Sequence, residues 1–391
     1  MRALAVAALV ACSGPKDAFE CTGNDSCRNG SIAGTCEATG FCSFPDPSCP
    51  SGARYGDAAG GGLAGQCVGP PGSDGGVVDP AAIGAWQVAT AVPVPRYTHA
   101  TATNGNFIYV FGGISGSTGR SDVWVASVNQ AAIEPMLAIT AWTQTTSLPA
   151  NRRTFGAAYD AGYVYVFGGR TDLTADTPDV LVAPVNLDGT IGAWTAAAAL
   201  PESVKCEAIA ASGSHVYLIG GKSAGVAKAF VLRAELANGT VGPWQLATNL
   251  DETVFDHAAV TANGFLYVIG GCASGNNMCN LLLDTVEVAR INADGSLGTF
   301  THTTSLPMPR SHHTAAVSSR GDVYVLGGTY GAHLSDPSTT DVVGAHLNAD
   351  GSVGAWTAMQ PLPNGRRRAT AAAIGSYLLL VHADTQVAQF Q

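Results

Sequence analysis

A repeat of 50 to 56 residues is the feature that most limits how this 391-residue chain can fold. Its plainest marker is an aromatic residue that recurs at these spacings, at Trp86, Trp142, Trp194, Trp244, Phe300 and Trp356. Each period contains the same features in the same order: a strand of small residues, an apolar run, a variable loop and a turn. Periods of this length are typical of solenoids and propellers, in which each unit buries its apolar faces against its neighbours. We therefore expect one structural unit built six times.

The apolar run ends in two adjacent glycines in five of the six periods. These runs are FIYVFGG, YVYVFGG, VYLIGG, LYVIGG and VYVLGG, whereas the sixth, YLLLVHA from Tyr377 to Ala383, has neither glycine. Unbroken apolar runs of this length predict strands that are buried on both faces. The glycines are expected to let neighbouring backbones approach closely. The predicted structural glycines are Gly112, Gly113, Gly168, Gly169, Gly220, Gly221, Gly270, Gly271, Gly327 and Gly328.

Short turn sequences predict how the strands are connected. Four Asp-Gly or Asn-Gly pairs lie between the third and fourth expected strands, at Asp188-Gly189, Asn238-Gly239, Asp294-Gly295 and Asp350-Gly351. Such pairs are typical of type I′ hairpins. Four antiparallel strands per period, repeated radially, form the blades of a β-propeller.

The composition agrees with an all-β protein that is rich in turns. Charged residues make up only 12% of the chain, which also contains 48 Gly and 20 Pro. A helical bundle or coiled coil would need many more Lys, Glu and Leu residues. The apolar share of 46% disfavours disorder.

The order of these features resembles the kelch repeat, which has a small-residue strand, a Y-V-x-G-G run, a variable loop and then Trp. The resemblance covers residues 81–391 and implies an all-β, six-bladed kelch-type β-propeller of the galactose oxidase-like superfamily. The segment AAIGAW, from Ala81 to Trp86, has the sequence of a fourth strand but no period of its own. We expect it to complete the last blade beside the C-terminal strand and so to close the ring.

The N-terminus predicts export. Arg2 is followed by an apolar run from Ala3 to Ala11, which is typical of a secretory signal over residues 1–11. The stretch Leu9 to Cys12 resembles a bacterial lipobox, which implies lipidation at Cys12 and an anchor at the outer membrane or cell surface. The alternatives are an ordinary cleaved signal or a start codon placed too late.

A cysteine-rich segment over residues 12–68 follows. Its six further cysteines are Cys21, Cys27, Cys36, Cys42, Cys49 and Cys67. No two neighbours are spaced as C-x-x-C, so the pattern favours disulfides in an exported module over a zinc site. Fifteen pairings are possible, and a stalk or an adhesive module are both open as roles. The Gly- and Pro-rich residues 69–80 are expected to be a flexible linker.

Three cysteines lie within the repeats. Cys272 and Cys279 bracket a short loop and are expected to form a disulfide that stiffens it. Cys206 is left over in a first strand and is expected to be a buried thiol.

In an up-and-down blade, successive connections between strands lie on alternate faces. This arrangement places all the long, variable loops on one face. The segment entering the first strand and the loop between the second and third strands lie on this face, whereas the opposite face has only tight turns. Rigid scaffolds carry recognition on such loops, so we expect binding there.

The positions of the arginines make the expected binding site on this face more specific. One column of the repeat alignment contains Arg96, Arg152, Arg310 and Arg366, and other basic residues follow it closely. The candidate ligand-binding residues are Arg96, Arg152, Arg153, Arg310, His312, Arg366, Arg367 and Arg368. Arg suits carboxylates, and a cationic patch in a chain of net charge −10 could focus anionic ligands. The resemblance implies an alternative for the column itself, because kelch repeats commonly use this Arg for hydrogen bonds between blades.

The same segments of the third and fourth periods are acidic. They carry Glu202, Glu207, Asp251, Glu252 and Asp256, so the face is expected to be divided by charge. The net charge disfavours nucleic-acid binding, and the only membrane contact expected is the N-terminal lipid.

Three functions remain open at this point. The first is a monomeric binding module for a protein or glycan, with an acidic ligand as one option. The second is an enzyme that modifies a sugar acid, such as an epimerase or mutarotase, with His99 or His257 as the base. The third is a structural scaffold of the cell envelope. The sequence contains no H-E-x-x-H, G-x-S-x-G or P-loop motif, and the Tyr, His and Cys copper ligands of galactose oxidases cannot be matched. We therefore predict no catalytic residue, metal or cofactor, and expect His99, His257 and His313 to be core residues.

Overall fold

The computed structural model describes residues 26–29, 32–36, 42–46, 53–56, 79–132, 134–171, 175–273, 279, 281–331 and 336–391. The chain divides into two compact units, Met1–Val78 and Asp79–Gln391. The predicted signal, the lipidation site Cys12, most of the predicted linker and the cysteines Cys21, Cys49 and Cys67 lie outside the described residues.

The described part of the first unit consists of short antiparallel strands. β1 (Arg28–Asn29) pairs with β2 (Ile32–Ala33), and a second sheet contains β3 (Thr35–Cys36), β4 (Cys42–Pro45) and β5 (Ala53–Tyr55). A disulfide joins Cys27 to Cys42, and Cys36 is also disulfide-bonded. Cys27 and Cys42 are buried, with Phe44 packed against them, so a cross-link stands where a larger domain has an apolar core.

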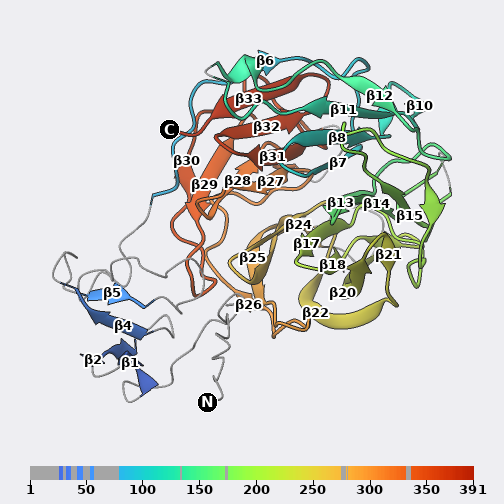
Figure 1. The fold of residues 1–391 in the computed structure, drawn as a ribbon. Coiled ribbons are helices and arrows are strands. Elements are labelled where there is room, and N and C mark those ends of the chain that lie inside the picture. The colour runs from blue at the N-terminus through green and yellow to red at the C-terminus, as the bar shows by residue number, and fades with distance from the viewer. Residues whose placement is uncertain are drawn as a thin grey trace, which may run out of the picture. The chain divides into compact units, whose positions relative to one another are not determined.

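The second unit is all-β and contains six antiparallel sheets, which we number in chain order (Figure 1). Sheet 1 consists of β7 (Ala100–Thr103), β8 (Phe107–Phe111), β11 (Val123–Ser127) and β12 (Thr143–Thr145). Sheet 2 consists of β13 (Gly156–Asp160), β14 (Tyr163–Phe167), β15 (Val180–Pro184) and β16 (Thr195–Ala196). Sheet 3 consists of β17 (Ala208–Ser212), β18 (His215–Ile219), β20 (Val226–Ala237) and β22 (Gln245–Val254), with β19 (Lys222–Ser223) and β21 (Thr240–Val241) paired to β20.

Sheet 4 consists of β23 (Ala258–Ala262), β24 (Phe265–Ala273), β25 (Leu281–Arg290) and β26 (Thr301–His302). Sheet 5 consists of β27 (Thr314–Val317), β28 (Asp322–Leu326), β29 (Val342–His346) and β30 (Thr357–Ala358). Sheet 6 consists of β31 (Thr370–Ile374), β32 (Tyr377–Val381), β33 (Thr385–Gln389) and the N-terminal strand β6 (Gln87–Ala89). Besides these six sheets, β9 (Ile114–Ser115) and β10 (Thr118–Gly119) pair in a small two-stranded sheet, and the 3-10 helix η2 (Pro135–Leu137) lies beside β6 and β33.

The repeating apolar runs form the second strand of each sheet. Their central residues are buried on both faces, because each sheet packs between two others. Tyr109, Tyr165, Tyr217, Tyr267 and Tyr324 occupy the same position in five of these strands, and each is 0% exposed. The core is therefore a series of apolar layers between consecutive sheets.

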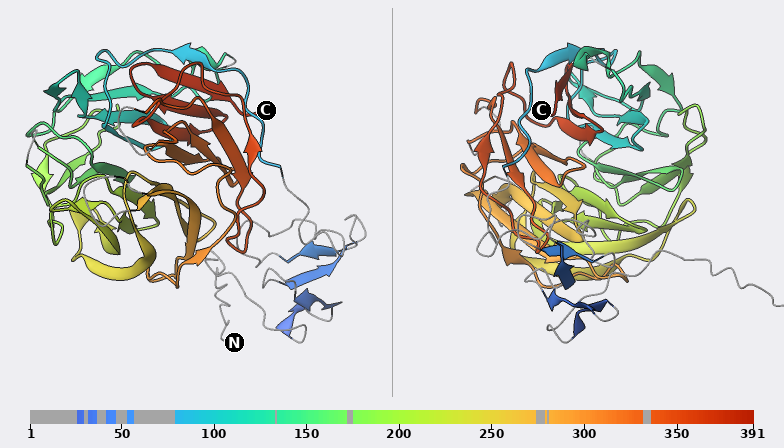
Figure 2. Two further views of the ribbon diagram at one scale, coloured as in Figure 1. Left: turned by 180° about the vertical axis from the view of Figure 1, so that it is seen from behind. Right: turned by 60° about the vertical axis from the view of Figure 1, so that its left-hand side comes forward.

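The two ends of this unit meet in sheet 6. β6 pairs antiparallel with β33, with Gln87 opposite Val387 and Ala89 opposite Thr385. The first strands of consecutive sheets are neighbours, and β31 of sheet 6 in turn lies beside β7 of sheet 1. Figures 1 and 2 show the six sheets of this unit around a common centre.

The recurring tryptophans join five of the six sheets to the preceding sheet, whereas sheet 4 has Phe300 at this position, which has no N–H group. The indole Nε1 of Trp142 donates to the carbonyl oxygen of Thr90 at 2.8 Å, and Trp194 donates in the same way to Thr146 at 3.0 Å. Trp244 and Trp356 make the equivalent bonds, and Trp86 donates to Gln360 at 2.9 Å. This shared bond explains the aromatic period.

The glycine pairs allow this close approach of sheets. All ten glycines have positive φ. In sheet 1, the amide of Gly113 donates to the carbonyl oxygen of Arg152 in the next sheet at 2.8 Å. A Cβ on Gly112 would lie 2.5 Å from that same oxygen, so a side chain cannot be placed there.

The prediction of type I′ turns is wrong at three of four positions. At Asn238-Gly239 both residues have positive φ, as type I′ requires, but at Asp188, Asp294 and Asp350 only the following glycine does. These three are type I turns followed by a left-handed glycine. The aspartate stabilises this form, since Oδ1 of Asp188 accepts a hydrogen bond from the amide of Thr190 at 2.9 Å.

Candidate functional site

Six residues at equivalent positions form a ring at the centre of the larger unit. We call them the central ring: Thr98, Thr154, Cys206, Asp256, His312 and Arg368. Each amide donates to the carbonyl oxygen of the preceding member at 2.8 to 3.3 Å, and the amide of Thr98 donates to Arg368. All six have a left-handed backbone, with φ between 49° and 57°. This conformation costs non-glycine residues about 1–2 kcal/mol each, and such strain is often found at functional sites.

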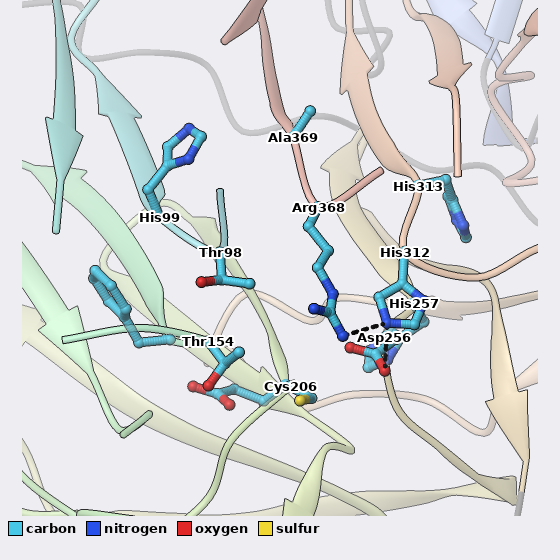
Figure 3. Close-up of a pocket in the computed structure, with 12 residues that line it drawn as sticks. Thr98, His99, Thr154, Cys206, Asp256, His257, His312, His313, Arg368 and Ala369 are labelled. Carbon is cyan, nitrogen blue, oxygen red and sulfur yellow. Dashed lines mark hydrogen bonds and ion pairs between the residues drawn. The ribbon is translucent and has the colours of Figure 1, made fainter. Parts of the chain in front are cut away.

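The central ring borders a cavity of about 110 Å³ (Figure 3). A second row of residues completes its lining, and each member directly follows a ring residue: His99, Phe155, Glu207, His257, His313 and Ala369. Every sheet therefore contributes two residues. By volume the cavity corresponds to roughly four water molecules, which suits one functional group or the tip of a larger ligand.

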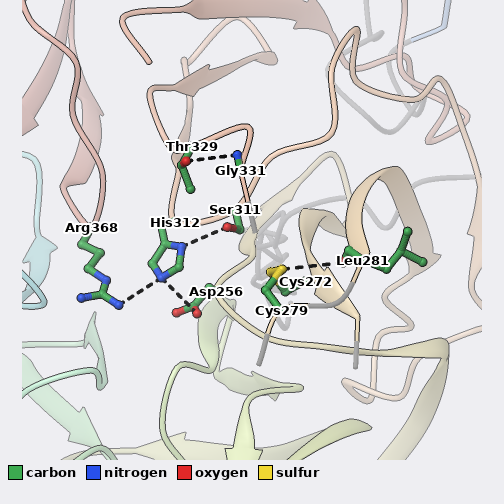
Figure 4. The surroundings of a disulfide bond; sticks show 9 residues. All are labelled: Asp256, Cys272, Cys279, Leu281, Ser311, His312, Thr329, Gly331 and Arg368. Atoms are coloured by element: carbon green, nitrogen blue, oxygen red, sulfur yellow. Dashed lines mark hydrogen bonds and ion pairs between the residues drawn. A yellow bond between two sulfur atoms is a disulfide. The ribbon is translucent and has the colours of Figure 1, made fainter. Parts of the chain in front are cut away.

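The central ring is polarised. Thr98, Thr154 and Cys206 are consecutive in the ring and have uncharged side chains. The other three members bring a carboxyl group (Asp256), an imidazole (His312) and a guanidinium (Arg368). The Nε2 atom of His312 lies 3.2 Å from Oδ2 of Asp256 and 3.2 Å from Nη2 of Arg368 (Figure 4). A ligand entering the cavity would meet a charged half and a neutral half.

Burial sets the protonation states of this lining. It lowers the pKa of His312 despite the nearby Asp256, so the imidazole is neutral at pH 7. It raises the pKa of the Glu207 carboxyl and of the Cys206 thiol well above their ordinary values. Cys206 is therefore a thiol and not a reactive thiolate.

The second-row histidines belong to the wall between sheets, as the core interpretation predicts. Burial lowers the pKa of His99 and of His313 to about 3, with help from Arg96 and Arg310 respectively, and that of His257 to about 4. Nε2 of His99 contacts Oγ1 of Thr370 at 2.9 Å, and Nε2 of His313 contacts the carbonyl oxygen of Ile269 at 3.0 Å. Both ring nitrogens of His257 are buried. Nδ1 of His99 and Nδ1 of His313 are also buried, so we assign none of the three histidines a role as a base.

Ser311, His312 and Asp256 form a hydrogen-bonded chain without being a nucleophilic triad. Oγ of Ser311 contacts Nδ1 of His312 at 2.9 Å, but Ser311 is only 1% exposed. A hydroxyl that no substrate reaches cannot attack one. Among the residues that the structure describes, no group of three or more His, Cys, Asp or Glu side chains is arranged to hold a metal ion.

Three predicted ligand-binding arginines are buried and hold their own sheets together. Nη1 of Arg96, Arg152 and Arg310 donates to the carbonyl oxygen of the first glycine of the pair in the same sheet, at 2.9, 2.9 and 3.3 Å. Arg96 also forms an ion pair with Asp122 at 2.7 Å. With exposures of 1%, 3% and 0%, these side chains are almost fully buried. Their hydrogen bonds also lie within a sheet, not between sheets as the resemblance implies.

The other predicted arginines are divided among different surroundings. Arg366 makes two hydrogen bonds to the carboxylate of Asp384, at 2.9 and 2.8 Å, and Arg367 donates to the backbone of Asp336 at 2.9 Å. Arg153 lies beside a separate cavity of about 120 Å³ together with Arg152 and Arg170. Of the eight candidates, only His312 and Arg368 lie in the central cavity.

The predicted acidic region contains a third cavity, of about 280 Å³, between β22 and β25. Asp251, Glu252, Asp284 and Glu287 line it, together with His302. Nearby, the disulfide between Cys272 and Cys279 joins the end of β24 to the start of β25 (Figure 4). The predicted loop cross-link is therefore present.

The sequence did not reveal the central ring as a unit. Its members are of five residue types and only threonine occurs twice, so no single letter marks this position in all six periods. Only the position of these residues in the repeat could have indicated the ring, because each member lies two residues after the arginine column.

The repeated four-stranded sheets, the glycine pairs and the tryptophan bonds are consistent with the fold of a kelch-type β-propeller. Kelch-like protein 13 of Bos taurus and that of Homo sapiens are each 34% identical to this chain over 85 residues, which is 22% of this chain. The match spans only 12% of the length of those relatives. No model of a known protein family matches the chain.

Among solved structures, that of YjhT, a kelch-type propeller, is similar to this chain with a TM-score of 0.59. The match covers 78% of this chain and 95% of the YjhT chain at 17% sequence identity. At this identity the likeness establishes the fold.

Proposed function

We propose that residues 81–391 form a closed, six-bladed propeller that acts as a binding module and receives its ligand in the central cavity. The ring of six backbone hydrogen bonds supports closure, and so does the pairing of β6 with β33. A closed ring gives six sheets one shared cavity, to which each contributes two residues. The binding site therefore depends on the whole ring.

One observation carries this proposal: Arg368 is a partly exposed cation on the lining of the cavity, beside a neutral histidine. A guanidinium in such a place binds a carboxylate through charge-assisted hydrogen bonds. The ligand is accordingly a glycan or protein that carries an acidic group. The variable loops on the same face would contact the rest of it.

The chain is further proposed to be an exported lipoprotein held at the outer membrane or cell surface through Cys12. The apolar run after Arg2 and the lipobox-like residues before Cys12 support this. In the described residues, no helix is long and apolar enough to cross a membrane. Metabolic labelling with a radioactive fatty acid tests the anchor: the chain should be labelled, and a C12S variant should not be.

A thermal-shift screen of the full chain tests the binding function. Uronic and sialic acids, acidic glycans and acidic peptides are compared with neutral sugars. A ligand at 100 times its dissociation constant adds about 2.7 kcal/mol of stability, which raises the melting temperature by roughly 2–4 °C or less in a chain of this size. A shift confined to acidic compounds supports the proposal. A shift with neutral sugars alone contradicts the acidic ligand, and no shift with any compound points to a scaffold.

A further inference from the structure

His312 has two neighbours that place incompatible demands on one nitrogen. Its Nε2 atom is 3.2 Å from both the carboxylate of Asp256 and the guanidinium of Arg368. A neutral imidazole nitrogen either carries a proton and donates, or is bare and accepts. It can donate to Asp256 or accept from Arg368, but it cannot do both. One of these two hydrogen bonds is therefore unmade at any moment.

The other nitrogen of His312 does not decide between the two states. Nδ1 faces Oγ of Ser311 at 2.9 Å, and a hydroxyl can donate or accept. Each tautomer therefore has a partner at Nδ1. Groups within the site decide between the two tautomers of His312, because solvent has little access to it. The side chain of His312 is 8% exposed and that of Asp256 is 16% exposed.

We propose that His312 is a tautomeric switch: an anionic group that binds Arg368 shifts the Nε2 hydrogen bond of His312 from Arg368 to Asp256. In the first state, Nδ1–H donates to Ser311 and Nε2 accepts from Arg368. In the second, Nε2–H donates to Asp256 and the Ser311 hydroxyl donates to Nδ1. The proton moves from Nδ1 to Nε2 through solvent, and the net charge of the site does not change.

The surrounding charges keep the imidazole neutral, which the switch requires. Burial lowers the pKa of His312, Asp256 opposes this, and Arg368, Arg367 and Lys222 add to it. His312 is a positioning residue in this scheme, since it releases Arg368 to the ligand and does not itself hold the ligand. The ligand step rests on the proposed function, whereas the competition between Asp256 and Arg368 does not.

Nitrogen NMR of the full chain labelled at histidine tests the competition without a ligand, because protonated and bare ring nitrogens have well-separated shifts. The His312 signals are assigned by their loss in H312Q. R368M removes the donor and should move His312 to the Nε2–H tautomer. D256A removes the acceptor and should move it to the Nδ1–H tautomer. The wild type should lie between the two.

These variants shift the tautomer in opposite directions, so either one is informative if the other fails to fold. Wild-type His312 signals in both, or a shift in the reverse direction, would overturn the switch. R320M is the control for the loss of an arginine, because Arg320 lies in the turn between β27 and β28, away from the central ring, and is 57% exposed. It should leave the His312 signals unchanged.

Titration with acetate then tests the ligand step. The wild type and R320M should move saturably toward the Nε2–H tautomer, and the acetate affinity of R368M should fall by about tenfold or more. If acetate has no effect while the variants behave as expected, the ligand-driven step is wrong and only the competition between Asp256 and Arg368 stands. If acetate binds but neither variant changes the tautomer, the switch is wrong and the binding site stands.

Discussion

At the scale of single residues, arginines at equivalent positions of the repeat have different roles. Arg96 is buried against Asp122, whereas Arg366 is partly exposed beside Asp384. The sequence predicts the column but not this difference, because burial depends on the loops that cover each sheet. Arg368 was predicted among eight candidates, and only its place on the cavity distinguishes it.

The arginine column allows the effect of burial on stability to be tested. R96M leaves Asp122 in the interior without its main partner, which is expected to cost about 3–5 kcal/mol. Burial raises the pKa of Asp122, but hydrogen bonds from Arg96 and Arg120 hold it well below its usual value. R366M breaks a more exposed pair and should cost less by about 1 kcal/mol or more. Urea unfolding of both variants measures the difference, and equal losses would refute the buried role of Arg96.

The second-row histidines predict that acid destabilises the protein. Their pKa values in the folded chain, about 3, 4 and 3 for His99, His257 and His313, lie below the ordinary 6.5. At a pH between the folded and the unfolded pKa of a histidine, the unfolded chain binds more protons than the folded chain. The free energy of unfolding therefore falls as the pH drops below 6.5. Each group contributes up to about 1.4 kcal/mol per pH unit. Glu207 opposes this with a raised pKa, since its contribution is lost as the pH rises above its ordinary value.

The measurement is urea unfolding of the wild type, H257Q and H302Q at pH 7, 6 and 5. H257Q should reduce the fall in stability, because one of the buried histidines with a lowered pKa no longer titrates. H302Q changes a histidine whose side chain is 53% exposed and serves as the control. An H257Q curve parallel to that of the wild type would show that His257 is not buried in the neutral form.

At the scale of elements, the glycine pairs are the part of the fold that the sequence predicts best. Their period and position after an apolar strand are visible in the letters alone. The turn types were less predictable, because the choice between two positive φ values and one depends on how Asp188 bonds to Thr190. The central ring was not predicted, since its six backbones share one conformation while their side chains have no common type.

Two glycine substitutions distinguish the cost of a steric contact from the cost of a left-handed backbone. G113A places a Cβ 2.8 Å from the carbonyl oxygen of Tyr97 at φ +93°, whereas G264A places one at φ +78° with nothing within 4 Å. Both substitutions cost about 1 kcal/mol or more from the left-handed backbone. G113A should cost about 1–3 kcal/mol beyond this from overpacking. Similar losses in urea unfolding would contradict the close contact between Gly113 and the backbone of Tyr97.

At the scale of the whole molecule, sheet 6 is assembled from both ends of the repeat region. β6 supplies its outer strand, and Trp86 adds a hydrogen bond to Gln360 in the preceding segment. The sequence predicts a fourth strand at Ala81 to Trp86, and the observed strand β6 begins directly after it, at Gln87. Stability is then shared by the ring and not by separate sheets.

Deleting residues 81–90 should therefore lower the melting temperature of all six sheets together. Deleting residues 69–78, an equal length of the predicted linker, should leave it unchanged. Circular dichroism of both variants is the measurement. An unchanged transition after loss of residues 81–90 would refute closure through β6.

The central claim is that one cavity on the propeller axis binds an acidic group through Arg368. Its most direct test is the affinity of R368M and of R320M, measured by calorimetry with the acidic compound that gives the largest thermal shift. The account predicts a loss of about 10- to 100-fold in R368M, as expected for hydrogen bonds to a charged group, and wild-type affinity in R320M. Wild-type affinity in R368M would place the ligand outside the central cavity and contradict the account.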